Sequence, residues 1–350
     1  MTAAVLVVGG DPLNWNCENW QAILLARGYE VIAARNGNAA LAICPHLQPD
    51  LVLLNEFLPD IHGFEVCRRL KADPRNRLTP VVLLKASGDS SDVSQGFEAG
   101  ADDFWEHSPT LEEVLIRVHS LLQLKTYIDE QAKSVIFSLA HSIEARDPCD
   151  RGHCSRVSNY AVRFGKCLGL SQDDLETLRI GGLIHDIGKI GVPETILSKP
   201  GPLDSEEARI VEQHPILGEQ ICAPLKSLRH VLPIIRHHHE RMDGSGYPDG
   251  LQGEQIPLNV RILQIVDICD ALTTDRSYRK GLSLPGALIV LFEEADRGWL
   301  DEGLVSQFAS LVVGSGISVA LGNRERPRPS DVEKKWSGSS SISLVNRRLA

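Results

Sequence analysis

The sequence predicts two domains of different fold class, an α/β domain followed by an all-helical domain. Between residues 5 and 122, short apolar runs alternate with helix-like segments, which indicates a parallel sheet covered by helices on both faces. Between residues 134 and 312 the pattern is helical and rich in Leu, Ile and Ala, with little strand character. A length of 350 residues suits two domains of roughly 150 residues each, plus connections.

The elements of the first domain alternate along the chain. Short apolar runs predict strands at 5–8, 31–33, 51–54 and 81–84. Helical patterns predict helices at 20–27, 39–44 and 64–72, and a long helix from residue 111 onward. In such folds ligand chemistry lies at the carboxyl ends of the strands, so these ends are the positions to inspect.

The long helix carries an apolar stripe out of the first domain. Its apolar residues recur at three- and four-residue steps, at Leu111, Leu115, Val118, Leu122, Val135, Leu139 and Ile143. Polar residues interrupt the stripe at Lys125, Thr126 and Asp129 to Lys133, so a break or exposed turn is expected near Tyr127. The stripe fits a signalling or dimerisation helix, and equally a helix packed on its own domain.

Composition narrows the function classes. A net charge of -10 argues against a protein whose affinity comes from neutralising nucleic-acid phosphates. No apolar run reaches the roughly 18 residues of a membrane span, and the start lacks the pattern of a signal peptide. The cysteines are scattered without a CxxC pair, which predicts neither a disulfide framework nor a thiolate zinc site. A cytoplasmic protein is expected.

The first domain resembles a response-regulator receiver. The resemblance covers residues 5 to about 122 and is carried by the segment from Asp50 to Val66 and by GFEAGADDF at 96–104. It implies a flavodoxin-like, doubly wound fold with a five-stranded parallel sheet. It also implies that the phosphoacceptor position of the family falls on Asn55, whose amide cannot form an acyl phosphate.

Other positions of the receiver phosphorylation site have also changed. The acidic pair that holds Mg²⁺ in the family is replaced in part by Gly9 and Gly10, which leaves only Asp11. Lys85 stands in place of the family's hydroxyl residue, and His107 in place of its lysine. Phosphoryl transfer needs carboxylate oxygens for Mg²⁺ and a nucleophile, so we expect a pseudo-receiver that does not take phosphate. Lys85 fits either an imitation of the phosphorylated contact or an ordinary solvated lysine.

The chemistry of the second domain is expected around GLIHDIGKIG at 182–191. An apolar stretch is followed directly by an imidazole and a carboxylate, His185 and Asp186. Lys189 lies one helical turn further on. A buried pair of this kind is costly unless both groups are satisfied, and metal coordination satisfies both. A structural hydrogen bond within a helical core is the simpler alternative for the dipeptide alone.

Further imidazoles and a carboxylate favour the metal interpretation. They lie in or beside apolar helical patterns, at His153, His214, His238, His239 and Asp267. Together with His185 and Asp186 they exceed what one ion accepts, so two divalent ions are expected, with Asp186 as the natural bridge. Paired ions roughly 3.5–4 Å apart stabilise the attacking and leaving oxygens of phosphoester hydrolysis and supply hydroxide near neutral pH.

The second domain resembles the HD-GYP group of HD metal-dependent phosphohydrolases. The matching segments are HDIGKIGVPETILSKPGPLD, the His214 segment, HHERMDGSGYPDGLQGEQIP and VDICDALTTDRSYRKGLS. The resemblance implies an all-helical fold and hydrolysis of cyclic di-GMP to pGpG, and further to GMP in some members. It implies metal ligands at His153, His185, Asp186, His214, His238, His239 and Asp267, and iron or manganese as the metal.

The same resemblance implies the substrate contacts. Lys189 matches the lysine on the scissile phosphate and is expected, with Asp186, to be catalytic. Phosphate-binding positions fall on Arg276 and Arg279, and the loop that names the family supplies Asp243, Gly246 and Tyr247, bordering the site or meeting a partner protein. Some members bind a third metal through a glutamate that is Cys149 here, so two ions are expected.

These observations define the expected organisation and activity. We expect a receiver-like domain at 1–122, a linker helix at 123–133, an HD-GYP domain at 134–321 and a disordered basic tail at 322–350. The expected activity is a cyclic di-GMP phosphodiesterase using hydroxide activated by two metals. The alternative is a non-catalytic adaptor that senses a cyclic dinucleotide. Expected contacts are the substrate, proteins at the pseudo-receiver and GYP loop, and a homodimer, but no nucleic acid or membrane.

Overall fold

The computed structural model describes residues 3–9, 17–85, 91–106, 110–146, 152–199, 201–275 and 280–314. The chain divides into two compact units. The first comprises residues 1–134 together with 223–228, and the second comprises residues 135–222 together with 229–350. None of the helices in the described ranges combines the length and the apolar character needed to cross a membrane.

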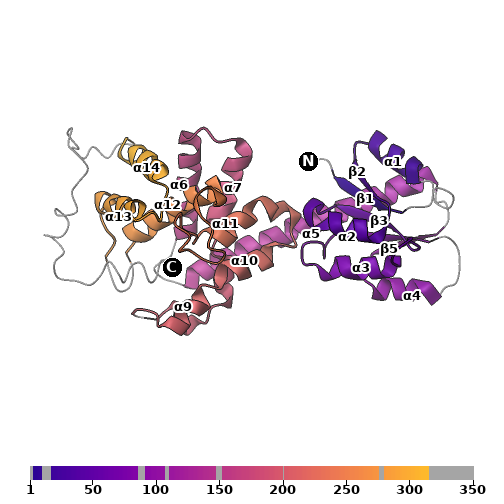
Figure 1. Ribbon diagram of the computed structural model, residues 1–350, viewed down its shortest axis with the longest axis horizontal. Coiled ribbons are helices and arrows are strands. Elements are labelled where there is room, and N and C mark those ends of the chain that lie inside the picture. The colour runs from indigo at the N-terminus through magenta and orange to yellow at the C-terminus, as the bar shows by residue number, and fades with distance from the viewer. Residues whose placement is uncertain are drawn as a thin grey trace. The chain divides into compact units, whose positions relative to one another are not determined.

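The first unit contains a five-stranded parallel sheet with the order β2-β1-β3-β4-β5 (Figure 1). Its strands are β1 (Ala4–Val8), β2 (Glu30–Ala34), β3 (Leu51–Asn55), β4 (Val81–Lys85) and β5 (Asp103–Glu106). Its helices are α1 (Cys17–Ala26), α2 (Gly37–Leu47), α3 (Gly63–Ala72), α4 (Ser91–Glu98) and residues 111–134 of α5 (Leu111–Arg146), whose remainder belongs to the second unit. This is the flavodoxin-like, doubly wound arrangement, so the predicted fold class is confirmed.

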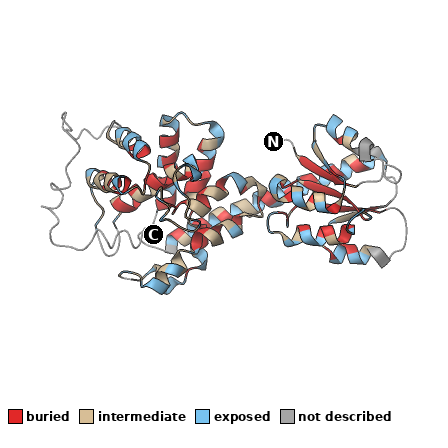
Figure 2. Ribbon diagram, viewed as in Figure 1, coloured by how far each residue is buried: buried red, intermediate tan, exposed pale blue. Residues whose placement is uncertain are grey.

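The central strands β1, β3 and β4 consist almost entirely of apolar residues because helices cover both faces of the sheet. Every residue of β1 and β3 is buried, as the red strands of Figure 2 show. Successive side chains point to opposite faces. Leu6 and Val8 therefore join a core with residues of α2 and α3, whereas Val5 and Val7 join a second core with residues of α1 and α5.

The long helix α5 runs without interruption from Leu111 to Arg146, so the predicted break near Tyr127 is wrong. Two of the polar residues that suggested a break, Lys125 and Asp129, form a buried ion pair along the helix. Lys125 is buried and lies 3.3 Å from Asp50 and 3.7 Å from Asp129, one turn further along α5. Tyr127 is exposed on the uninterrupted helix. Buried ion pairing therefore accommodates charge at positions where the sequence suggests a turn.

Asn55 and Lys85 end neighbouring strands, β3 and β4, at the carboxyl edge of the sheet. Both residues are buried, and the Asn55 side-chain oxygen accepts a hydrogen bond from the backbone N–H of Phe57 at 3.2 Å. Burial of Lys85 excludes the interpretation as an ordinary solvated lysine. Of the other positions of the receiver site, Gly10, Asp11 and His107 lie outside the described residues, whereas Gly9 directly follows β1.

Helices are the regular elements of the second unit among its described residues, apart from an isolated bridge between Asp243 and Gln252, which confirms the predicted class of this domain. Its elements are α6 (His153–Cys167), α7 (Gln172–Ile184), η1 (Ile187–Gly191), α8 (Glu194–Leu197), α9 (Ser205–Val211), α10 (His214–Cys222), η2 (Lys226–Val231), α11 (Leu232–His237), η3 (Gly253–Gln255), α12 (Leu258–Thr273), α13 (Leu284–Asp296) and α14 (Glu302–Gly314).

Helix α12 forms the centre of the second unit. It is buried on several sides and contacts α6, α7, α11, α13 and α14. The rings of Phe164 and Phe308, from α6 and α14, pack edge to face with centroids 5.3 Å apart. Because α12 is surrounded by helices, a polar side chain on it faces the interior rather than solvent. The predicted tail at 322–350 lies outside the described residues.

Candidate metal centre

The predicted ligands lie mainly at helix ends that meet beside α12. His153 begins α6, His185 follows the last residue of α7, and His214 begins α10. Asp186 immediately precedes η1, whereas His238 and His239 follow the end of α11. Asp267 lies within α12. The fold therefore brings together side chains that are far apart in sequence, as the sequence analysis expected.

Glycines allow the backbones around Asp186 to approach closely. A Cβ atom on Gly188 would overlap the backbone carbonyl of His214, and one on Gly218 would lie 2.8 Å from a methyl carbon of Ile235. Gly182 is similarly constrained, because its Cβ would lie 2.5 Å from the Cα of Ser158 on α6. These contacts explain the glycines of the GLIHDIGKIG segment. They let η1 lie against α10 and let α7 lie against α6.

The imidazoles are oriented by acceptors on their Nδ1 side. His214 Nδ1 lies 2.6 Å from the carbonyl oxygen of Val211, and His238 Nδ1 lies 2.9 Å from that of Ile235. His185 Nδ1 likewise lies 3.2 Å from the carbonyl oxygen of Gly182. A carbonyl oxygen only accepts, so we assign the proton of each ring to Nδ1. Each Nε2 then presents a lone pair.

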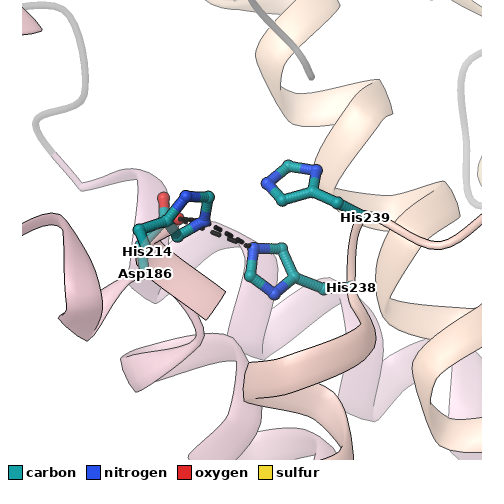
Figure 3. Close-up of side chains that lie close together, drawn as sticks. All are labelled: Asp186, His214, His238 and His239. Carbon is teal, nitrogen blue, oxygen red and sulfur yellow. Dashed lines mark hydrogen bonds and ion pairs between the residues drawn. The ribbon is translucent and has the colours of Figure 1, made fainter. Parts of the chain in front are cut away.

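These lone pairs converge on carboxylate oxygens. His214 Nε2 lies 3.1 Å from His238 Nε2 and 3.3 Å from Asp186 Oδ1, as Figure 3 shows. His185 Nε2 and Asp186 Oδ1 are both buried and have no hydrogen-bond partner among the described residues. Acceptors that face one another repel unless a cation lies between them. The donor set therefore fits divalent metal ions, and the outward Nδ1 hydrogen bonds are those of metal-ligating histidines.

Two groups of ligand atoms share one carboxylate. The first contains Asp186, His214, His238 and His239, and the second contains His153, His185 and Asp186. Within each group the ligand atoms lie within 4.8 Å of one another. Asp267 Oδ1 completes the second group, at 3.1 Å from His153 Nε2 and 3.8 Å from His185 Nε2. The geometry offers two adjacent sites with Asp186 common to both.

Burial and charge set the protonation of these groups. Desolvation lowers the pKa of His185 to about 4 and lowers that of His214, so both imidazoles are neutral at neutral pH. Burial opposes ionisation of Asp186, but the Lys189 ammonium at 2.6 Å outweighs it and holds the pKa of this carboxyl well below its usual range. Neutral imidazoles and ionised carboxylates are the forms that coordinate metal.

A second carboxylate on α12 supports His153, and the sequence analysis missed it. His153 Nδ1 donates to Asp270 Oδ2 at 2.8 Å, and Asp270 also accepts from Arg156 Nε at 2.7 Å. Asp270 is buried and follows Asp267 by three residues, one helical turn. That spacing, which places both carboxylates on one helix face, is the signal that could have identified it.

The GYP loop lies against the first group. The ring of Tyr247 stacks on His239 with centroids 4.9 Å apart, and its hydroxyl oxygen is buried without a hydrogen-bond partner among the described residues. Gly246 is required because a Cβ there would overlap the backbone of Arg241. Asp243, in contrast, is exposed and accepts a hydrogen bond from the backbone of Ser245 at 2.8 Å.

Two predicted positions among the described residues are not part of this centre, and three predicted positions of the second domain lie outside the described residues. Asn55 belongs to the first unit. Arg276 and Arg279, predicted to bind phosphate, and Cys149, the departure that suggested two ions rather than three, lie outside the described residues. Asp243 does not line the pocket beside the metal ligands.

A receiver fold joined to a helical domain with a buried His/Asp cluster defines a response regulator with a metal-dependent hydrolase domain. Residues 5–118 match the response regulator receiver domain, and residues 138–304 match the HD domain. The cyclic di-GMP phosphodiesterase response regulator RpfG of Xanthomonas campestris pv. campestris is 32% identical over 281 residues, covering 74% of this chain and 74% of that protein.

Two further relatives share this similarity. A cyclic di-GMP phosphodiesterase of Thermotoga maritima is 32% identical over 305 residues, 79% of this chain and 81% of that protein. The 3'3'-cGAMP-specific phosphodiesterase 3 of Vibrio cholerae is 37% identical over 165 residues, 47% of this chain and 36% of that protein. The chain therefore belongs to the family of HD-GYP response regulators that includes cyclic di-GMP phosphodiesterases.

Proposed function

We propose that this chain is a metal-dependent phosphodiesterase that hydrolyses cyclic di-GMP to the linear dinucleotide pGpG. The observation that carries the proposal is the convergence of imidazole Nε2 lone pairs on the carboxylate of Asp186. Relatives that share about three quarters of their length with this chain are named as cyclic di-GMP phosphodiesterases, which supports the substrate.

Two divalent ions, iron or manganese, would occupy the two ligand groups. One ion would be held by His214, His238 and His239. The other ion would be held by His153, His185 and Asp267, and Asp186 would contribute to both sites. Histidine and carboxylate ligands without thiolate suit either metal. Bound ions of this kind activate water near neutral pH and neutralise charge on a phosphodiester.

The residues around the ions would position the substrate and offset its charge. The Lys189 ammonium lies beside Asp186, where it can offset negative charge on the scissile phosphate. Tyr247 stacks its ring on His239 and lines the pocket beside the metal ligands. Arg276 and Arg279 follow α12 in the sequence and would bind the phosphates, since guanidinium groups pair with them in bidentate geometry.

The test compares Asp186→Asn with Asp296→Asn, an exposed residue at the end of α13. Both replace a carboxylate by its isosteric amide, but only the first removes a shared ligand. After anaerobic loading with Fe²⁺ or Mn²⁺, Asp186→Asn should bind less metal and lose turnover, while Asp296→Asn should match the wild type. Wild-type protein carrying two ions and leaving cyclic di-GMP intact would refute the proposal in favour of a ligand-sensing adaptor.

We further propose that the receiver does not take phosphate. Asn55 offers an amide where an acyl phosphate would form, and its oxygen is already bonded to Phe57 N–H. Acyl-phosphate donors should therefore leave activity and oligomeric state unchanged. A phosphorylated species in intact-mass measurements would refute this.

A further inference from the structure

A pocket extends from the metal ligands towards α13 and the loop that follows it. At one end it is bordered by His238, His239 and Asp267, and the GYP loop contributes Ser245, Gly246 and Tyr247. At the other end it is lined by Glu294, Trp299 and Leu300. A ligand whose phosphate lies at the metal centre would therefore extend its next chemical group towards α13.

Glu294 is buried at this far end, with 5% of its surface exposed. Its carboxylate accepts no hydrogen bond from the described residues, although Arg241 and Arg297 act on it electrostatically. Arg241 is itself held with its guanidinium 3.9 Å from the centre of the Trp299 ring. A buried acceptor of this kind is costly unless a ligand supplies donors.

The other buried glutamate of the lining is fully used by the protein. Glu240 accepts the backbone N–H of Asp249 at 2.7 Å and that of Leu251 at 3.0 Å. Gln264 donates to the backbone oxygen of Glu240 at 2.6 Å and so also acts within the fold. Glu294 is therefore the buried carboxylate of the lining that is available to a ligand.

The chemistry of Glu294 fits the Watson–Crick edge of guanine. Guanine presents two parallel donors, N1–H and the N2 amino group, which match the two oxygens of a carboxylate in a bidentate, charge-assisted pair. Adenine presents one donor beside an acceptor, its N1, which a carboxylate oxygen would repel. A site built around such a pair rejects the base that leaves it unpaired.

We propose that Glu294 reads a guanine of the substrate and makes this chain selective for cyclic dinucleotides that contain guanine at that position. The inference rests on the proposed phosphodiesterase function and deepens it. The reacting phosphodiester would lie at the metal centre, one ribose away from the base, and the pocket joins the two places. Glu294 is thus a specificity residue that would contact the base and not the reacting atoms.

The test is a change of selectivity in the metal-loaded full chain. Glu294→Gln replaces the carboxylate by an amide, which presents one acceptor and one donor and so complements adenine instead of guanine. Glu293→Gln is the matched control, because it makes the same change one residue earlier, outside the pocket lining. The values of kcat/KM are measured for cyclic di-GMP and cyclic di-AMP at pH 8, with metal content verified, alongside binding of both ligands.

For Glu294→Gln we expect the cyclic di-GMP to cyclic di-AMP ratio of kcat/KM to fall about 10–100-fold, mainly through KM, with an equal shift in relative binding. Glu293→Gln should leave the ratio unchanged. If Glu294→Gln lowered kcat/KM equally for both substrates, or for neither, the inference would be overturned while the phosphodiesterase function stayed intact. A wild type that neither binds nor cleaves cyclic di-GMP would instead overturn the function, and this inference with it.

Discussion

The buried contact between His153 and Asp270 makes a testable prediction about metal binding. Asp270→Asn keeps the size of the side chain but replaces one acceptor oxygen by a donor. The wild-type carboxylate accepts from His153 Nδ1 at 2.8 Å and from Arg156 at 2.7 and 2.9 Å. Oδ2 accepts from both His153 Nδ1 and Arg156 Nη2, while Oδ1 accepts from Arg156 Nε, so an amide has only one of these two acceptors left. Its NH2 group must face either Arg156 Nε–H or His153 Nδ1–H, and in the second case the His153 ring loses its acceptor or must change its tautomer.

The size of the effect follows from the burial of the pair. The side chains of His153 and Asp270 are 7% and 5% exposed, so solvent does not replace the lost bond. A hydrogen bond to a charged group contributes about 1.5–3 kcal/mol, and removing such a partner of a ligating histidine weakens metal binding about 10–100-fold. The Arg156 side chain is 37% exposed, so its ion pair with Asp270 contributes less to stability than the buried His153 hydrogen bond, because water screens its charge.

The assay is a chelator-competition titration with Mn²⁺, which resolves the two binding steps. We expect the step that involves His153 to weaken by about 10–100-fold and the step at His214, His238 and His239 to keep its affinity. Asp296→Asn serves as the control and should bind both ions normally. Wild-type affinity for both ions in Asp270→Asn would refute the reasoning that Asp270 fixes the His153 tautomer.

Three further predictions concern packing, protonation and the receiver. Gly182→Ala places a Cβ 2.5 Å from the Cα of Ser158 and should lower the free energy of unfolding by about 1–3 kcal/mol in urea titrations, whereas Gly286→Ala, which meets no atom closer than 3.4 Å, should not. Burial raises the pKa of Glu294 from 4.5 to about 7, so between these pH values the folded chain binds more protons than the unfolded chain. The free energy of unfolding therefore falls as the pH rises through this range. In Glu294→Gln this fall should be smaller by about 3 kcal/mol. If the free energy of unfolding of the wild type and of Glu294→Gln depended on pH in the same way, this prediction would be contradicted. Asn55→Asp should remain unphosphorylated by acyl-phosphate donors in mass spectra, because the paired acids are still missing.

Local patterns were sufficient to predict four of the five strands of the first unit, whereas the fifth strand followed only from the receiver resemblance and α4 was not predicted. Buried parallel strands read as short apolar runs because both faces of the sheet are covered, and the observed strands contain the predicted ranges with one or two additional residues. The break near Tyr127 was wrong for a nonlocal reason. Lys125 is stabilised by Asp50, which is 75 residues away in the chain, and no window of sequence around Lys125 contains that partner.

The clustering of the predicted His and Asp side chains could be anticipated because each residue is polar in an apolar setting, and such residues need a reason to be buried. The supporting residues could not be predicted in the same way. Asp270 shares its helix face with Asp267, so the sequence does not tell which carboxylate faces the metal and which supports His153. Glu293 and Glu294 are adjacent, and only the packing of α13 determines which of them is buried.

The most direct test of the account measures metal content and product on the same sample. The full chain is reconstituted anaerobically with Fe²⁺ or Mn²⁺, the ions per chain are counted by elemental analysis, and cyclic di-GMP and its products are separated by chromatography. The account predicts two ions per chain and conversion of cyclic di-GMP to pGpG. Two bound ions with cyclic di-GMP unchanged would contradict it.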